Sequence, residues 1–147
     1  MDLSNNIHQF VIFKLEDEEY GVDILKVKTI EKMTKIARVP KTAQYVEGVI
    51  NLRGEVVPII DLRKKFNLPK SIETDNTRII IVSIEDITVG LIVDSASEVI
   101  EIPKESIEET PELVGNIDQS NISSIGKVNE RIIILLNIER ILSAVIV

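Results

Sequence analysis

A short polar turn between two apolar, β-branched runs is the feature that most restricts how this chain can fold. Within residues 46–61, the turn Asn51-Leu52-Arg53-Gly54 separates two segments rich in Val and Ile. This pattern predicts a β-hairpin. Asn51 suits the first corner of a type I turn, with Leu52 and Arg53 at its centre. Gly54 suits a following left-handed position, which glycine reaches without a steric penalty.

The predicted hairpin would hold Arg53 at its tip, with the planar guanidinium available to a partner. The alternative is that Arg53 is an ordinary solvated turn residue. Pro58 cannot donate a hydrogen bond to a neighbouring strand, so the return strand is expected to be an edge or to carry a bulge.

Most of the other predicted elements are strands. Within the predicted strand at residues 9–15, Phe10 to Phe13 are apolar on both faces, as in a strand buried between two layers. Further strands are predicted at residues 20–22, 34–39, 78–84, 88–93, 99–102, 122–128 and 131–136. Short helices are predicted at residues 24–30 after Asp23, 42–45, 62–66 after Asp61, and after Asn137, since Asp and Asn are good helix caps. Residues 70–76 and 104–119 have no clear period.

An internal similarity indicates two related halves. Residues 15–21 match residues 84–90 at an offset of 69, and residues 56–62 match residues 132–138 at an offset of 76. Halves of this size bury little apolar surface alone, so we expect them to share an interface. Chance similarity between Ile-rich strands is the alternative.

Composition excludes several classes of function. The 147 residues include no Cys and one His, His8, which removes disulfides, thiolate nucleophiles and the usual Ser/His/Asp arrangements. We expect no catalytic residues, no metal and no cofactor. A net charge of -7 with 3% aromatic residues argues against nucleic-acid binding. No apolar stretch is long enough to cross a bilayer, and there is no signal peptide pattern. These features are compatible with a reducing cytosol.

Several motifs together resemble the CheW family of bacterial chemotaxis coupling proteins. They lie at residues 18–27, 48–66, 89–94 and 131–139, so the resemblance covers nearly the whole chain. It implies an all-β fold, mainly strands with a few short helices, in which two small five-stranded SH3-like β-barrels pack together. Residues 1–147 would form one CheW-like domain with lobes at about 8–69 and 77–147. Exchange of terminal elements between the lobes stays open.

The resemblance also implies a function. The chain would be a non-catalytic adaptor that links a chemotaxis histidine kinase, through the regulatory domain of the kinase, to the cytoplasmic hairpin tips of methyl-accepting chemoreceptors. It would be cytoplasmic and associated with receptor arrays, without inserting into the membrane. A receptor helical hairpin would occupy the groove between the lobes.

Matching positions give candidate site residues. On the receptor side these are Val27, Gly48, Arg53, Gly90, Ala96 and Val99. On the kinase side they are Val22 and Leu25. Arg53 would be the polar anchor, and the two glycines would allow close approach of a backbone; the alternatives are bulge-forming glycines and core valines. Many relatives have an acidic residue where this chain has Thr29, with Glu31 nearby, so a salt bridge at that position is in doubt.

Two other functions stay open at this point. One is a small-molecule-binding β-barrel or a carboxylate-based hydrolase, which would show a deep pocket with converging carboxylates. The other is the coupling domain of a receiver-fused relative or of the kinase itself. A free-standing adaptor is preferred, because no phosphoacceptor or second domain follows Val147.

Overall fold

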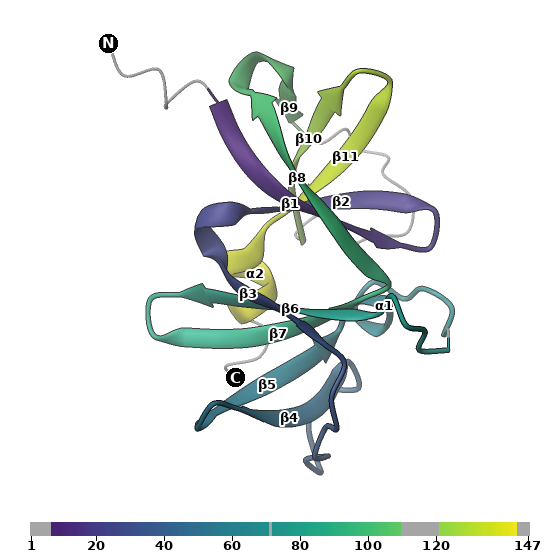
Figure 1. Ribbon diagram of the computed structural model, residues 1–147, viewed down its shortest axis with the longest axis vertical. Coiled ribbons are helices and arrows are strands. Elements are labelled where there is room, and N and C mark those ends of the chain that lie inside the picture. Colours follow the sequence, from purple (N-terminus) through teal and green to yellow (C-terminus); the bar gives the residue numbers. More distant parts are fainter. Residues whose placement is uncertain (1–6, 71, 110–120, 144–147) are drawn as a thin grey trace.

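The chain folds into two curled β-sheets with a short helix between them. A computed structural model describes residues 7–70, 72–109 and 121–143, apart from the side chain of residue 97. One sheet has six strands and the other has five. Figure 1 shows the six-stranded sheet at the top, the five-stranded sheet at the bottom, and helix α2 (Ile138–Ser143) in the space between them.

The six-stranded sheet has the order β8-β1-β2-β11-β10-β9. Its strands are β1 (Ile7–Leu15), β2 (Glu18–Asp23), β8 (Ser95–Pro103), β9 (Ile107–Glu109), β10 (Ile122–Val128) and β11 (Arg131–Leu136). The five-stranded sheet has the order β3-β6-β7-β5-β4. Its strands are β3 (Val27–Lys32), β4 (Val46–Leu52), β5 (Glu55–Asp61), β6 (Arg78–Ile84) and β7 (Ile87–Val93). The all-β class is confirmed, although one sheet has a sixth strand, β9.

The sheets divide the chain differently from the two halves seen in the sequence. The five-stranded sheet is built from one continuous segment, residues 27–93, whereas the six-stranded sheet combines β1 and β2 with strands after residue 94. The cause is an exchange of hairpins between the halves. The β1–β2 hairpin pairs with β8 and β11 of the second half, and the β6–β7 hairpin pairs with β3 and β5 of the first. The expected lobes at 8–69 and 77–147 therefore do not coincide with the sheets.

Three apolar cores follow from burial of both faces of the central strands. Alternate residues of a strand point to opposite faces. On β6, Ile79 and Ile81 fill the inside of the five-stranded sheet, while Ile80 and Val82 join a core shared by both sheets. On β1, Phe10 and Ile12 fill the inside of the six-stranded sheet, and Val11 and Phe13 join the shared core. The prediction that residues 9–15 are buried on both faces is confirmed for Phe10 to Phe13.

The central hairpin is confirmed, but its turn is tighter than expected. Leu52 pairs with Glu55, so the loop contains only Arg53 and Gly54. Arg53 has φ 50° and Gly54 has φ 90°. Two left-handed residues in a two-residue loop match the twist of the flanking strands, as in a type I′ turn. The expected type I turn centred on Leu52 and Arg53 is therefore wrong. The Asn51 side chain does take part, since its Oδ1 accepts a hydrogen bond of 2.9 Å from the Gly54 N–H.

Three short segments also differ from the sequence prediction. Residues 24–30 are a single 3₁₀ turn, η2 (Ile24–Lys26), followed by β3, because β-branched residues pair there with β6. Residues 34–39 form no strand beyond one bridge between Ala37 and Val49, and residues 42–45 are a turn. Within residues 104–119, the described part contains the 3₁₀ turn η3 (Lys104–Ser106) and β9; residues 110–119 lie outside the described residues.

The expected helix caps are confirmed. Asp61 accepts hydrogen bonds from the N–H groups of Arg63 and Lys64 at the start of α1 (Leu62–Lys65). Asn137 accepts one of 3.1 Å from the N–H of Arg140 in α2. Asp23 accepts one of 3.0 Å from Leu25 in η2.

Gly90 on β7 offers a direct test of the inner core of the five-stranded sheet. A Cβ at this position would lie 2.5 Å from Ile59 Cδ1 and 2.7 Å from Ile79 Cγ2. We expect Gly90→Ala to lower the free energy of unfolding by about 1–3 kcal/mol through overpacking, measured by urea denaturation.

The matched control is Ile59→Val, which removes the nearest colliding atom. Alone it should cost about 0.5–1.5 kcal/mol, but in the Gly90→Ala background it should restore part of the loss. Strictly additive effects of the two substitutions would contradict this packing.

Candidate functional site

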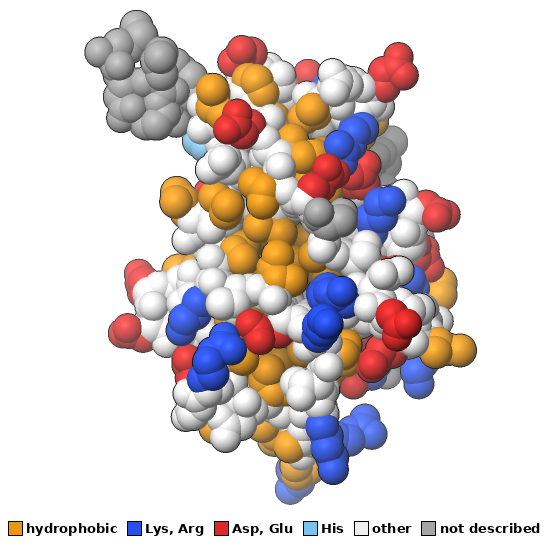
Figure 2. All heavy atoms as spheres, viewed as in Figure 1, with side chains coloured by type: hydrophobic (Ala, Val, Ile, Leu, Met, Phe, Trp, Pro, Cys, Tyr) orange, Lys and Arg blue, Asp and Glu red, His pale blue; other side chains and the backbone are white. Residues whose placement is uncertain are grey.

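Edge strands β3 and β8 carry three of the residues expected to bind a receptor. Val27 begins β3 and Ala96 lies near the start of β8; both are half-buried against the shared core. Val99, further along β8, is 50% exposed. Figure 2 shows hydrophobic side chains gathered on this face, over the region where β1 and β8 lie above β6. A contiguous apolar area of this kind is typical of protein-binding surfaces.

Arg53 lies at the tip of the β4–β5 hairpin and contacts the opposite edge of its own sheet. Its Nη2 is 3.3 Å from Oε2 of Glu31 on β3, and Lys28 Nζ on β3 is 3.4 Å from Oε2 of Glu55. Since β3 and β4 are the two edges of this sheet, the ion pairs bridge its open seam. The Arg53 side chain keeps 67% of its surface exposed, which leaves guanidinium donors accessible to a partner.

The acidic partner of Arg53 is Glu31. This chain therefore has a salt bridge at this part of β3 although Thr29 replaces the acidic residue of many relatives. Residues 29 and 31 lie on the same face of β3, because side chains alternate along a strand. Thr29 and Glu31 are both half-buried, whereas the alternate residues Lys28 and Ile30 are exposed. An acid two residues further along β3 therefore forms an ion pair with Arg53 in this chain.

The six-stranded sheet has a corresponding ion-pair cluster. Arg131 is the first residue after the β10–β11 turn, the position that Glu55 has after the β4–β5 turn. Its guanidinium contacts Glu19 on β2 and Glu98 on the edge strand β8. The hydrogen bond from Arg131 holds the pKa of Glu19 below its usual value. Each hairpin thus contacts an edge strand of its own sheet through charged side chains.

The two glycines expected to meet a partner face the interior of this chain. A Cβ on Gly48 would lie 2.1 Å from the Ala37 carbonyl oxygen, and its φ of 147° also favours glycine. Gly90 faces Ile59 and Ile79. Both glycines are buried. The close approach that they allow is therefore between parts of the same chain, not with a partner backbone.

The two residues expected on the kinase side lie in contrasting places. Val22 is completely buried in the shared core, so it does not present a side chain to a partner. Leu25, three residues later in η2, is 88% exposed. An apolar side chain with so much of its surface in water on an otherwise ordered turn is a candidate contact.

An ion-pair cluster centred on Arg63 joins the two sheets, and the sequence did not reveal it. Arg63, in α1, donates from Nε to Asp94 Oδ1 over 2.8 Å and from a second nitrogen to Oδ2. Its Nη1 donates to the Pro69 carbonyl over 2.7 Å and lies 3.3 Å from Glu16 in the β1–β2 turn. Asp94 Oδ2 also accepts a 2.7 Å hydrogen bond from the Glu16 N–H.

This cluster has a definite effect on the pKa of Asp94. Burial acts to raise that pKa, but the hydrogen bonds from Arg63 and from the Glu16 N–H outweigh burial and lower it. The pKa of Arg63 is raised in turn, chiefly by its hydrogen bond to Asp94. The carboxylate form of Asp94 is therefore stabilised in the folded protein.

Residues 7–70, 72–109 and 121–143 contain neither a metal-ligand cluster nor a membrane-spanning helix. No cluster of three or more His, Cys, Asp or Glu side chains there has a geometry suited to a metal ion. No helix in the same residues has the length and apolar character needed to span a membrane.

Comparison with known proteins identifies the family. The profile of the CheW-like domain matches residues 9–145. The chain belongs to the CheW family. It is 42% identical over 134 residues to the chemotaxis protein CheW of Bacillus subtilis, an alignment that covers 91% of this chain and 86% of the relative. It is 39% identical over 136 residues to the CheW of Klebsiella aerogenes, covering 92% of this chain and 82% of the relative.

A solved CheW structure supports the fold in detail. The crystal structure of scaffolding protein TtCheW from Thermoanaerobacter tengcongensis superimposes with a TM-score of 0.84 and 41% sequence identity. The match covers 88% of each chain. The two curled sheets described above are thus the CheW architecture.

The pKa of Asp94 predicts how stability depends on pH. Because the folded-state pKa lies below the ordinary value of 3.8, the ionised group contributes stability above that pH, and this contribution is lost as the pH falls through the folded-state pKa. We expect Asp94→Asn to lower the free energy of unfolding by roughly 1–3 kcal/mol at pH 7, since an amide cannot accept both guanidinium hydrogen bonds. The difference from wild type should shrink as the pH falls below about 4.

Urea denaturation at pH 7, 5 and 3 would measure this difference. Asp75→Asn is the matched control, because Asp75 is exposed and its side chain makes no ion pair among the described residues. A pH-independent loss for Asp94→Asn, or an equal loss for Asp75→Asn, would contradict the assignment.

Proposed function

We propose that this chain is a chemotaxis coupling protein, a non-catalytic scaffold that links a histidine kinase to the cytoplasmic tips of chemoreceptors. The observation that carries the proposal is the match to the CheW family along nearly the whole chain, with TtCheW described as a scaffolding protein. We further propose that the chain works in the cytoplasm, in receptor arrays at the inner face of the membrane.

The receptor hairpin tip would dock on the face bordered by β3 and β8. Val99 and the half-buried Val27 and Ala96 would supply the apolar wall, and Arg53 would supply a polar anchor near one end. A helix packs its apolar side into such a surface, and a guanidinium at the edge selects a carboxylate or carbonyl. Gly48 and Gly90 would contribute indirectly, by allowing the packing that shapes the five-stranded sheet.

The regulatory domain of the kinase would contact the surface around η2. Leu25 is the apolar side chain most exposed there, and it lies next to the ion pair between Lys26 and Glu139. An exposed leucine beside charged groups resembles the anchor-and-rim arrangement of protein interfaces. Val22 would act only by supporting the strand that precedes η2.

Packing inside the sheets supports a scaffold over a ligand-binding barrel. Phe10, Ile12 and Ile133 fill the inside of the six-stranded sheet, and Ile50, Val57 and Ile59 fill much of the other. A small-molecule barrel needs an internal cavity lined by a few convergent polar groups. Side chains occupy that space here.

Arg53→Ala tests the receptor site. We expect binding of a receptor cytoplasmic hairpin fragment to weaken at least tenfold, because Arg is a frequent hot-spot residue. The free energy of unfolding should change by no more than about 0.5 kcal/mol, since the side chain is exposed and makes one surface ion pair. Binding of the kinase regulatory domain, measured in parallel by fluorescence anisotropy, should change less than twofold.

Lys127→Ala is the matched control, because Lys127 is an exposed cation paired with Glu108 at 3.1 Å in the other sheet. It should leave both affinities unchanged. Unaltered receptor binding by Arg53→Ala would remove Arg53 from the site, and a loss of several kcal/mol in stability would make its role structural.

A further inference from the structure

Positive charge is concentrated in the five-stranded sheet of this acidic protein. Residues 27–93 contain eleven of the 17 Lys and Arg residues but only eight of the 24 Asp and Glu residues, which gives a formal charge of +3 and leaves -10 for the rest of the chain. From the last residue of β3 toward β4, every third residue is basic and exposed: Lys32, Lys35, Arg38 and Lys41. The segment that joins these strands therefore presents a basic edge.

The same segment forms one wall of a hollow of about 410 Å³. Its position is well defined, because Ala37 and Val49 exchange two backbone hydrogen bonds of 2.9 Å. Gly48 makes this contact possible, since a side chain there would collide with the Ala37 carbonyl. Met33, Ile36 and Ile92 give the hollow an apolar floor and pack against the inner core of the sheet.

Most charged groups around the hollow already have partners. Lys64 pairs with Glu47, and Arg63 is bound to Asp94. Asp61 is half-buried and accepts hydrogen bonds from two N–H groups of α1. These groups shape the hollow but have little charge left for a ligand.

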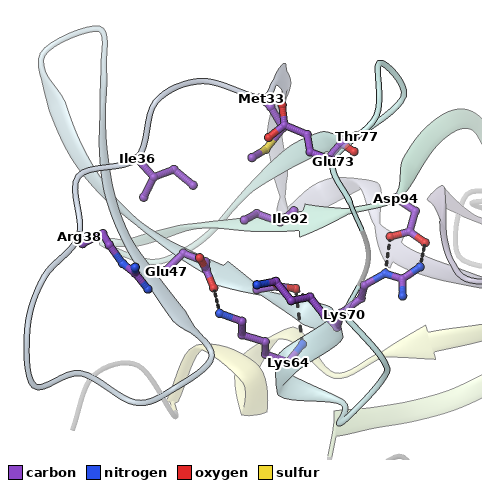
Figure 3. A pocket seen from close by; sticks show the side chains of 12 residues that line it. Met33, Ile36, Arg38, Glu47, Lys64, Lys70, Glu73, Thr77, Ile92 and Asp94 are labelled. Carbon is purple, nitrogen blue, oxygen red and sulfur yellow. Dashed lines mark hydrogen bonds and ion pairs between the residues drawn. The ribbon is translucent and has the colours of Figure 1, made fainter.

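Arg38 and Lys70 differ from these groups. Both line the hollow, and neither lies within ion-pair distance of an acid among the residues that the structure describes. Figure 3 shows the two side chains reaching toward the hollow from opposite sides, with the Lys64–Glu47 pair between them. Glu73, another lining residue, lies beside Met33, away from these two cations. Two separate cations thus flank an apolar floor.

We propose that this hollow is an additional protein-docking site, which takes an acidic segment of a partner protein with one apolar side chain between its acids. The apolar side chain would rest on Met33, Ile36 and Ile92, and acids on either side of it would pair with Arg38 and Lys70. The basic segment 32–41 would extend the attraction along the bound peptide and speed its association. A small anion would instead need several donors converging on one point, whereas Arg38 and Lys70 approach from opposite sides.

The site lies outside the proposed receptor surface. None of Val27, Arg53, Ala96 or Val99 lines the hollow, and neither does Leu25. The proposal therefore stands or fails separately from the proposed coupling function. A partner bound here could occupy the chain together with one bound on the β3 and β8 face.

The test uses the full chain and a fluorescein-labelled peptide with a central Leu flanked on each side by three acidic residues. We expect saturable binding by fluorescence anisotropy, and amide NMR shifts centred on the hollow, including Ile36 and Ile92. The double substitution Arg38→Glu and Lys70→Glu should weaken binding at least tenfold. The matched control, Lys14→Glu in β1 with Lys104→Glu in η3, makes the same change in net charge at exposed sites outside the five-stranded sheet and should bind within twofold of wild type.

Other outcomes would overturn the proposal. These are equal binding of a peptide with Asn and Gln in place of the acids, equal weakening in both double variants, or NMR shifts centred elsewhere. Displacement of the peptide by inorganic phosphate or ATP at similar concentrations would show a small-anion site instead. Loss of receptor binding by Arg53→Ala, with peptide binding retained, would separate the two surfaces.

Discussion

Burial of the central strands on both faces holds the two sheets of this member of the CheW family together. A strand at the surface of a sheet alternates between core and water, whereas β1, β6 and β11 send alternate residues into a sheet interior and into the shared core. A register shift of one residue in such a strand would exchange the apolar side chains of the sheet interior with those of the shared core, and would expose neither set to water. The correct register is therefore selected by how well the side chains fit their neighbours. The angle between the sheets, and with it the face that carries Val27 and Val99, is therefore set by packing on both sides rather than by a linker. The Arg63–Asp94 contact adds a polar link at the edge of this core.

The sequence predicted the elements better than their arrangement. The apolar run at residues 9–15 and the two internal matches correctly located β1 and the hairpins β1–β2, β4–β5, β6–β7 and β10–β11. It left an exchange between the halves open but did not show that the hairpins β1–β2 and β6–β7 change places, because a hairpin has the same local pattern whichever half it pairs with. At residues 24–30 an apolar spacing compatible with a helix competed with β-branched residues, and strand pairing with β6 prevailed.

For the site, local sequence located exposed features and missed those made by distant residues. Arg53 follows from turn chemistry alone, as does the capping role of Asp61. Val22 and the two glycines were placed by family resemblance, which does not distinguish a contact residue from one that supports it. The Arg63–Asp94 contact depends on β5 and β7 being parallel neighbours, since the residues that follow two such strands meet at the same edge. Only the parallel pairing of β5 with β7, had it been known, would have predicted the Arg63–Asp94 contact.

The exchange of the β1–β2 and β6–β7 hairpins has a consequence for biosynthesis. All strands of the five-stranded sheet are present once the ribosome has made residue 93, whereas the six-stranded sheet needs β1 from the start of the chain and β11 from near its end. Domains form as their contacts become available during translation. β1 and β2 therefore remain unpaired with β11 while more than a hundred further residues are synthesised. During that time their apolar side chains can pack against the five-stranded sheet, as they do in the shared core of the folded protein.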